Sequence, residues 1–224
     1  MATQITIREV PISFPQLFER RVPPGVLNAT PKFSAEFLVP IDHPQVGEIK
    51  QICFNEAAAT FGADKAPHMA TPLKTADEVN AERRRKGKDA RPEVTGRYRI
   101  SASNANAVLI ADESGQGHLN TASDMEEKTW LEHMKSRIGA GVIVNALVEI
   151  YGFPQKQNPG VFCSLKGVQF VRDSGPGVMD LGGDRPAPTN AFAPVAGAAP
   201  SNPASAPWQS RGEPVVETNT DDLI

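Results

Sequence analysis

Basic side chains stand beside aromatic ones at several places in this chain, and together they can bind a single strand of nucleic acid. Cations along a groove neutralise phosphates, and an exposed ring stacks on a base with about 1–3 kcal/mol. Lys156 follows Tyr151 and Phe153, and two arginines flank Tyr98. The residues expected to contact nucleic acid are Arg20, Arg21, Lys32, Arg83, Arg84, Arg85, Arg97, Arg99, Tyr151, Phe153, Lys156 and Lys166.

Arg97 and Arg99 are the strongest individual candidates among the cations. They stand two residues apart in a segment that alternates like a strand, so they share one face of a sheet and give it positive charge. The run from Arg83 to Lys88 contains more charges. A run of that kind is more often a solvated loop than a specific contact, so the number of charges alone decides nothing.

The aromatic residues divide between the core and the surface. Phe33 and Phe37 lie on an apolar alternating face and are expected in the core, which is also favoured for Tyr98. Tyr151 and Phe153 stand where a strand enters a loop rich in Pro, Gly and Asn. For these two, a core position and a stacking platform are equally compatible with the sequence.

Motifs for enzymatic chemistry are absent from the sequence. The Gly-x-Gly pairs at 115–117 and 139–141 lack the rest of a phosphate-binding loop, and there is no GxSxG motif. Cys53 and Cys163 have no histidine nearby and are expected to be buried free thiols. The four histidines lack metal-ligand spacing. We therefore predict a protein without catalytic activity, metal or cofactor, and a nuclease would require three carboxylates to converge in space.

Five segments alternate in the manner of β-strands. Pro11 is expected to end the first strand, and Gly167 in the middle of the last strand indicates a bulge. The predicted strands are 4–12, 32–39, 96–102, 142–151 and 161–171.

Two helices interrupt these strands. The first is predicted over 44–61 and stopped by Gly62; the second begins with a capping box at Ser123 and carries an apolar stripe through Trp130, Leu131, Met134 and Ile138. Strands with inserted helices and no βαβ alternation favour a mainly β fold, a small antiparallel barrel such as the OB-fold.

The segment 75–91 between these helices is polar throughout. Thr75 and Glu78 have the spacing to cap a helix, but no apolar face follows them. We predict an exposed, mobile basic loop.

Charge is distributed unevenly along the chain. The net charge is −3, yet residues 1–172 carry 21 basic against 19 acidic side chains. Residues 173–224 carry 2 basic against 7 acidic. An acidic tail on a more basic body is typical of proteins whose contact with a polyanion is regulated, or whose tail recruits partners.

The composition of the tail predicts the domain organisation. Residues 185–212 are dominated by Ala, Pro, Ser and Asn without periodicity, which prevents a packed core. We predict one β-rich domain over 1–175, a flexible linker over 176–212 and an acidic tip over 213–224. The tip residues expected to bind a partner are Asp221, Asp222, Leu223 and Ile224.

The chain lacks signals for a membrane. Hydrophobic residues make up 40% of it, and no apolar run approaches the roughly 18 residues that span a bilayer. The first residues lack a basic segment followed by an apolar one. A cytoplasmic protein is expected.

Four segments, in their order and spacing, resemble a known family. They are 31–40, 96–103, 138–145 leading into Tyr151-Gly-Phe153, and 160–173. The first 175 residues are similar to the bacteriophage single-stranded-DNA-binding proteins of OB-fold type that serve replication and recombination. The resemblance implies cooperative coating of single strands in the host cytoplasm. It also implies a tail that recruits a polymerase, helicase or recombinase and competes with DNA for the basic groove.

An alternative function is a protein-interaction adaptor whose barrel presents an edge or loop to a partner and whose tail only solubilises it. A continuous positive groove with an exposed aromatic ring would favour DNA, whereas scattered charge around an apolar patch would favour the adaptor. Self-association is left open by the sequence.

Overall fold

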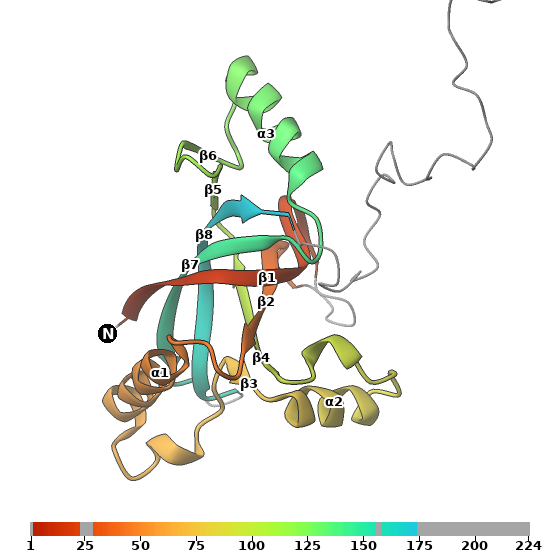
Figure 1. Ribbon diagram of the computed structural model, residues 1–224. Helices are drawn as coiled ribbons and strands as arrows, with labels where there is room; N and C mark the ends of the chain where they lie inside the picture. Colours follow the sequence, from red (N-terminus) through yellow and green to blue (C-terminus); the bar gives the residue numbers. More distant parts are fainter. Residues whose placement is uncertain (1, 23–28, 156–157, 174–224) are drawn as a thin grey trace, which may run out of the picture. The chain divides into compact units, whose positions relative to one another are not determined.

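The centre of the structure, a computed structural model that describes residues 2–22, 29–155 and 158–173, is a closed barrel (Figure 1). Its five strands are β1 (Ala2–Arg21), β2 (Lys32–Pro40), β4 (Arg97–Asn104), β7 (Ile143–Phe153) and β8 (Gly160–Arg172). Neighbours in the order β4, β2, β1, β7, β8 pair antiparallel, and a parallel contact between Ser103 and Ser164 joins β8 to β4. The mainly β barrel expected from the sequence is confirmed.

Two insertions interrupt the barrel strands. Between β2 and β4 lie α1 (Val46–Phe61), η1 (Ala66–His68), β3 (Leu73–Lys74), α2 (Ala76–Arg85) and η2 (Pro92–Val94). Between β4 and β7 lie β5 (Leu109–Ala111), β6 (Gly117–Leu119) and α3 (Met125–Arg137). In Figure 1, α1 and α2 lie at one end of the barrel and α3 at the other. No helix in the described chain is long and apolar enough to cross a membrane.

Apolar side chains at alternate strand positions point inward and form the barrel core. Phe33 and Phe37 on β2 are buried, as predicted. From α1, Ile49 and Ala57 join the same core, so the helix packs against the barrel. Cys53 is a buried free thiol, like its counterpart on β8, and burial raises its pKa to about 12. The thiol therefore stays protonated at neutral pH.

The first strand is longer than its sequence pattern indicates. Pro11 does not end β1, which continues to Arg21. The strand changes partner near Pro11, because residues 2–11 pair with β7 and residues 12–21 pair with β2. A register shift between Ile7 and Val10 includes Glu9 at φ 51°, and this bulge turns the strand from one partner to the other.

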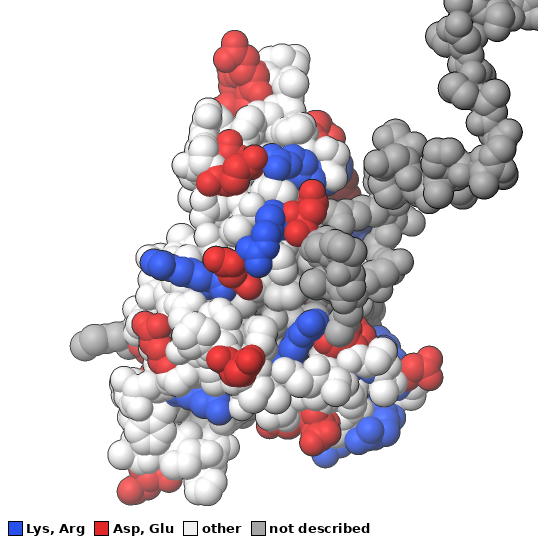
Figure 2. Space-filling model, in the orientation of Figure 1, with Lys and Arg blue, Asp and Glu red and all other residues white. Residues whose placement is uncertain are grey.

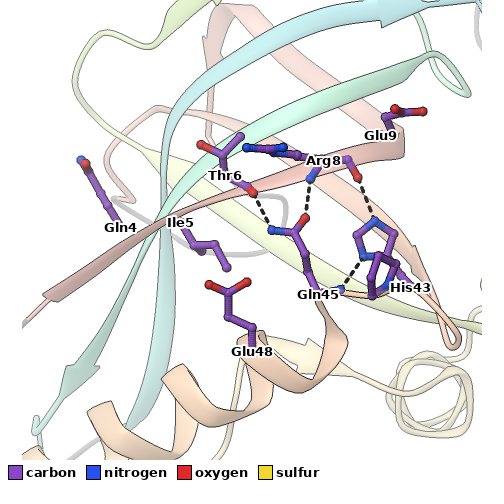
Figure 3. Close-up of a pocket in the computed structure, with 9 residues that line it drawn as sticks. Gln4, Ile5, Thr6, Arg8, Glu9, His43, Gln45 and Glu48 are labelled. Carbon is purple, nitrogen blue, oxygen red and sulfur yellow. Dashed lines mark hydrogen bonds between the residues drawn. The ribbon is translucent and has the colours of Figure 1, made fainter.

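Side chains rather than a strand cover the outer edge of the first half of β1 (Figure 3). Gln45 accepts a hydrogen bond from the Arg8 N–H and donates one to the Thr6 carbonyl, each at 2.9 Å. His43 lies 2.9 Å from the Arg8 carbonyl. Gln45 thus mimics a paired strand residue and protects part of an edge that would otherwise accept another chain.

The segment 75–91 differs from the predicted mobile loop. It forms α2, with the expected capping box between Thr75 and Glu78. Val79 is buried against Leu38 and Val94 on the outside of the barrel. A single apolar residue is too weak a pattern to predict docking, so the prediction of an undocked loop was wrong.

Two finer predictions have different outcomes. The bulge expected near Gly167 is confirmed, because the β7–β8 register shifts between Leu147 and Val148. The N-cap of α3 is Asp124 rather than Ser123, and its side chain accepts a hydrogen bond from the Glu126 N–H at 2.8 Å. An aspartate caps as well as a serine does, and the predicted capping box placed the start of the helix one residue too early.

Candidate nucleic-acid interface

Three aromatic side chains gather on the outer face of β7 and β8. Tyr151 pairs in register with Phe162, and their ring centroids are 6.4 Å apart. Phe153 meets Phe162 edge to face at 5.6 Å. All three are partly exposed, and they form the aromatic patch (Tyr151, Phe153, Phe162). Burial raises the pKa of Tyr151, so its ring remains a neutral phenol.

Small polar side chains continue this outer face from β8 to β2. Ser34 pairs in register with Ser103, which in turn pairs with Ser164. Ser101 lies two positions along β4 on the same face and is exposed. We name this set the serine floor (Ser34, Ser101, Ser103, Ser164). Short hydroxyl side chains allow a polymer backbone to approach the sheet closely and offer it hydrogen bonds.

Lys166 and Glu149 stand beside the serine floor. Glu149 is in register with Ser164, and the Lys166 ammonium lies 2.8 Å from the Glu149 carboxylate. Lys166 occupies the bulge before Gly167, a glycine whose Cβ would lie 3.2 Å from the Leu109 carbonyl. A phosphate that binds Lys166 therefore competes with the carboxylate of Glu149 for the ammonium.

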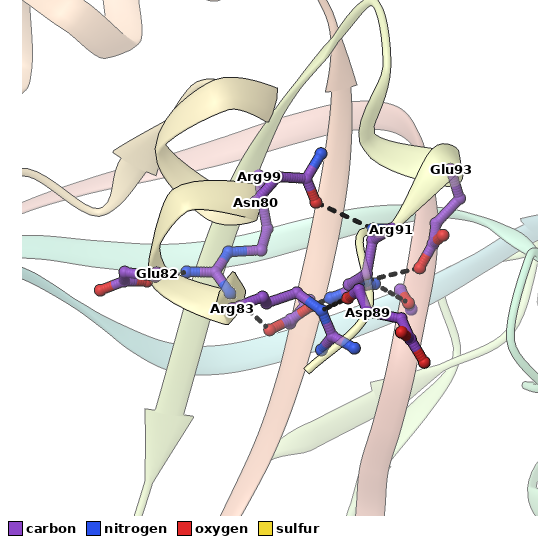
Figure 4. Close-up of polar contacts among 9 residues, drawn as sticks. Asn80, Glu82, Arg83, Asp89, Arg91, Glu93 and Arg99 are labelled. Carbon is purple, nitrogen blue, oxygen red and sulfur yellow. Dashed lines mark hydrogen bonds and ion pairs between the residues drawn. The ribbon is translucent and has the colours of Figure 1, made fainter. Parts of the chain in front are cut away.

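A chain of alternating charges crosses the outer face of β2 and β4 (Figure 4). Arg99 lies 3.2 Å from Glu36 and 3.7 Å from Glu82, and Lys74 lies 2.7 Å from Glu82. The Arg99 side chain is only 16% exposed, and its Nε is buried with no hydrogen-bond partner among the residues that the structure describes. The charge of Arg99 is therefore already compensated, which the alternation of the sequence did not reveal.

Arg91 anchors the α2 segment to the barrel. Its guanidinium pairs with Glu36 on β2 and with Glu93 at 2.5 Å, and donates to Ser13 on β1 at 3.0 Å. It also lies over the ring of Phe14, 4.6 Å from the centroid. Burial alone would lower the pKa of Arg91, but hydrogen bonds to the two carboxylates outweigh it and raise the pKa.

The other predicted cations on this side lie around α2 and the start of β4. Arg83 donates from Nε to the Asp89 carbonyl at 2.6 Å, whereas Arg84 and Arg85 are exposed in the last turn of α2. Arg97 is partly exposed and reaches the Glu93 carbonyl at 3.4 Å. The exposed pair on α2 is thus accessible to a polyanion beside the charged chain.

A second basic group lies at the end of the β1–β2 pair. Arg21 is in register with Lys32, and both are exposed. Arg20 is exposed too, and its guanidinium lies 5.2 Å from the centroid of the Phe33 ring. These three cations are close in space because the two strands pair to their ends.

The remaining predicted positions lie outside the described residues. They are Lys156 and the tip residues Asp221, Asp222, Leu223 and Ile224. The linker and tip boundaries lie there as well, so these stay predictions.

The sequence places Phe162 on the same strand face as Lys166 but did not single it out as a contact residue, and sequence reasoning missed the serine floor. The signal for the serines is present, since Ser101 and Ser103 alternate with buried residues on β4. On the side shown in Figure 2, basic and acidic side chains are interleaved over the barrel. Within the described chain, no group of three or more His, Cys, Asp or Glu could hold a metal ion.

Comparison with known proteins gives these features a context. The family model described as "Enterobacter phage Enc34, ssDNA-binding protein" matches residues 3–199. The structure is similar to that of the single-stranded-DNA-binding protein from bacteriophage Enc34 in complex with ssDNA, at 21% identity and a TM-score of 0.57. That alignment covers 77% of this chain and 88% of the other.

A second solved structure shares the fold. It is gp2.5, a single-stranded-DNA-binding protein encoded by bacteriophage T7, at 12% identity and a TM-score of 0.50, covering 77% of this chain and 93% of that one. Among curated protein sequences there is no match. With a barrel of this topology and a family match over most of its length, the chain belongs to the single-stranded-DNA-binding protein family of Enterobacter phage Enc34.

Proposed function

We propose that this protein binds single-stranded DNA, without catalytic activity, across the outer face of β8, β7 and β4. The observation that carries the proposal is the aromatic patch beside the serine floor, with Lys166 on the far side of Ser164 from the patch. Bases stack on the rings, the sugar-phosphate chain passes over the serines, and cations contact the phosphates. Binding of this kind tolerates any sequence, because every base has a face that stacks.

The predicted cations have unequal parts in this proposal. Lys32 and Lys166 contact phosphates at the two sides of the serine floor, and Arg20, Arg21, Arg84 and Arg85 attract the strand from the ends of the face. Arg99 and Arg83 act mainly within the protein, since both already have partners. Steering by surface cations weakens with salt, which makes their role measurable.

The biological setting is the coating and protection of single strands during phage DNA replication and recombination in the cytoplasm of the host. The acidic tip would recruit replication proteins and compete with DNA for the cations. Support comes from the family and from the concentration of negative charge after residue 172. A linker keeps the tip at high effective concentration near the barrel.

Titration of fluorescent oligo-dT, short enough for one copy, at two salt concentrations tests the proposal. We expect low-micromolar or tighter binding that weakens with salt. Phe162→Ala and Tyr151→Ala should each weaken binding by about 5- to 150-fold, which corresponds to about 1–3 kcal/mol of stacking, without a change in salt dependence. Phe54→Ala is the matched control, because Phe54 is an exposed aromatic residue on α1.

Charge variants give an independent readout of the same face. Lys166→Ala should lower the slope of log affinity against log salt by up to about 0.7, the value for one phosphate on a single strand. Glu149→Gln should strengthen binding, because it releases Lys166 and removes a negative charge beside the phosphates. Salt-insensitive binding, or aromatic variants that bind like the Phe54→Ala control, would refute the proposal.

The adaptor function keeps one specific observation in its favour. An apolar groove between α1 and η1 presents Phe54 at its surface, apart from the aromatic patch. If oligo-dT does not bind at either salt concentration, this groove is the surface with which to search for a protein partner.

A further inference from the structure

A shallow hollow with a mainly apolar surface lies along one side of α3. Met125, Thr129 and His133 line it at four-residue spacing, together with Glu126 and with Trp130, which also packs against the barrel core. Met125 is 75% exposed, and Leu119, at the end of the preceding β6, is 53% exposed. Large apolar side chains grouped at the end of a helix mark a surface for contact with another protein.

The same end of α3 is acidic. Asp124 caps the helix, Glu126 and Glu127 lie in its first turn, and Glu127 is 3.2 Å from His118. Glu126 is exposed and has no cationic partner in the described part of the chain. Figure 2 shows acidic side chains at this free end. A partner surface should therefore be apolar with a positive border.

The groove between α1 and η1 has these properties. Its volume is about 300 Å³, and its apolar lining includes Pro67, Met69 and Phe54, which is 43% exposed. Lys50 stands in its wall, with Nζ 2.9 Å from the Tyr98 hydroxyl and 4.7 Å from the ring centroid. Among residues 2–22, 29–155 and 158–173, no carboxylate pairs with Lys50. Its charge is therefore available to an incoming carboxylate.

The two surfaces lie at opposite ends of the barrel, α3 at one end and α1 with η1 at the other (Figure 1). A helix with an apolar face can dock in an apolar groove through side chains one turn apart. Because the surfaces are different and far apart, one molecule cannot satisfy its own groove with its own helix. Contacts between two different surfaces join copies head to tail into a row or a ring.

We propose that the free end of α3 from one copy docks in the α1–η1 groove of a second copy of this chain. Met125 enters the groove against Phe54 and Met69, the part-buried Trp130 stays at the rim of the contact, and Glu126 faces Lys50. The contact leaves the aromatic patch and the serine floor open. A row of copies joined in this way would hold successive stretches of one DNA strand. A test of the contact by DNA binding therefore rests on the proposed function.

Charge reversal on each side tests the contact. The full-length protein and its Lys50→Glu and Glu126→Lys variants are titrated with oligo-dT that holds one copy and with oligo-dT several times longer. The wild type should bind each site of the long oligonucleotide about 5- to 150-fold more tightly than the short one, a usual range of coupling between sites. Each single variant should lose this gain in affinity on the long oligonucleotide and keep its affinity for the short one.

The double variant K50E/E126K should recover much of the gain, because the opposite charges face each other again. A gain that persists in both single variants, or that is absent from the wild type, would overturn the proposal.

Sedimentation velocity of the protein without DNA keeps this test separate from DNA binding. We expect concentration-dependent association of the wild type, and none with Met125→Asp, an exposed position where folding should be unaffected. If the wild type fails to bind the short oligonucleotide yet associates in this way, the proposed function fails and the contact stands. Wild-type protein that remains monomeric and shows no gain on long oligo-dT refutes the contact.

Discussion

A buried arginine among carboxylates decides how the outer face of the barrel is arranged at the residue scale. Arg91 is 5% exposed and joins β1, β2 and η2 through Ser13, Glu36 and Glu93. A guanidinium has five donors in a fixed fork, so one side chain can satisfy several acceptors at once. Its removal leaves carboxylates in a poorly hydrated site without compensation.

Arg91→Met should therefore destabilise the protein by about 3–5 kcal/mol, the usual cost of removing one partner from a buried ion pair. Urea unfolding at neutral pH measures the change. Arg84→Met is the matched control, because Arg84 is exposed on α2, and it should change stability by less than about 0.5 kcal/mol. Equal stability of the two variants would contradict the anchoring role. If Arg91→Met does not fold, Arg91→Lys takes its place in the same measurement.

The carboxylate of Glu93 makes the same cluster sensitive to acid. Burial alone would raise the pKa of Glu93, but hydrogen bonds from Arg91 and from the backbone, with the charge of Arg91, hold it below its ordinary value. A carboxyl group whose pKa is lowered by folding stabilises the protein at pH values above its pKa in the unfolded chain, about 4.3. This stabilisation is lost as the pH falls through the pKa in the folded protein.

We therefore expect the unfolding free energy to decrease as the pH falls below about 4.3, and to decrease less steeply in Arg91→Met. Urea unfolding over a series of pH values gives both slopes. Parallel curves for the two proteins would show that the cluster does not contribute to the pH dependence.

At the scale of elements, α1 depends on a strand position without a side chain. A Cβ at Gly152 on β7 would lie 1.9 Å from the Thr60 hydroxyl and 2.9 Å from the Glu56 carbonyl. The second atom belongs to the helix backbone and cannot rotate away. The close approach of α1 to the barrel therefore requires glycine at this position.

Gly152→Ala should shift α1 and destabilise the protein by about 1–3 kcal/mol, the usual cost of overpacking. Gly47→Ala on α1 is the control, because nothing lies within 4 Å of its Cβ and alanine favours the helix. Thermal unfolding should separate the two variants in opposite directions. A Gly152→Ala protein as stable as the wild type would mean that the helix can move without cost.

Pattern reasoning succeeded or failed element by element for physical reasons. The strands β2, β4, β7 and β8 alternate because one face packs in the barrel, so their positions were predictable. The length of β1 was not, because a strand that changes partner at Pro11 combines two patterns with a bulge between them. Docking of α2 was missed because it depends on Val79 and on the distant Arg91.

At the scale of the whole molecule, charge is divided between the barrel and the tail. Residues 1–172 have a slight basic excess, whereas residues 173–224 are strongly acidic for their length. Several barrel cations are also paired with carboxylates, so the attraction of the barrel for a polyanion is moderate. A tail of the opposite sign can then compete with DNA for the unpaired cations.

Removal of residues 213–224 should raise the affinity for oligo-dT at low salt, because the truncated chain loses four carboxylates, those of Glu213, Glu217, Asp221 and Asp222. The increase should diminish at high salt, where electrostatic competition is screened. Fluorescence titration of full-length and truncated protein at both salt concentrations provides the measurement. An unchanged affinity at low salt would show that the tip does not compete with DNA.

The sequence by itself determined the mainly β class, most barrel strands, the buried thiols and the uneven charge, since these depend on alternation and composition along the chain. Only the tertiary structure decided which residues form one surface. Phe162 meets Tyr151 through strand pairing, and the serine floor joins three strands that are far apart in sequence. Compensation of Arg99 by Glu36 and Glu82 was equally hidden. Ion pairs and stacked rings depend on distances across the sheet, which no local pattern contains.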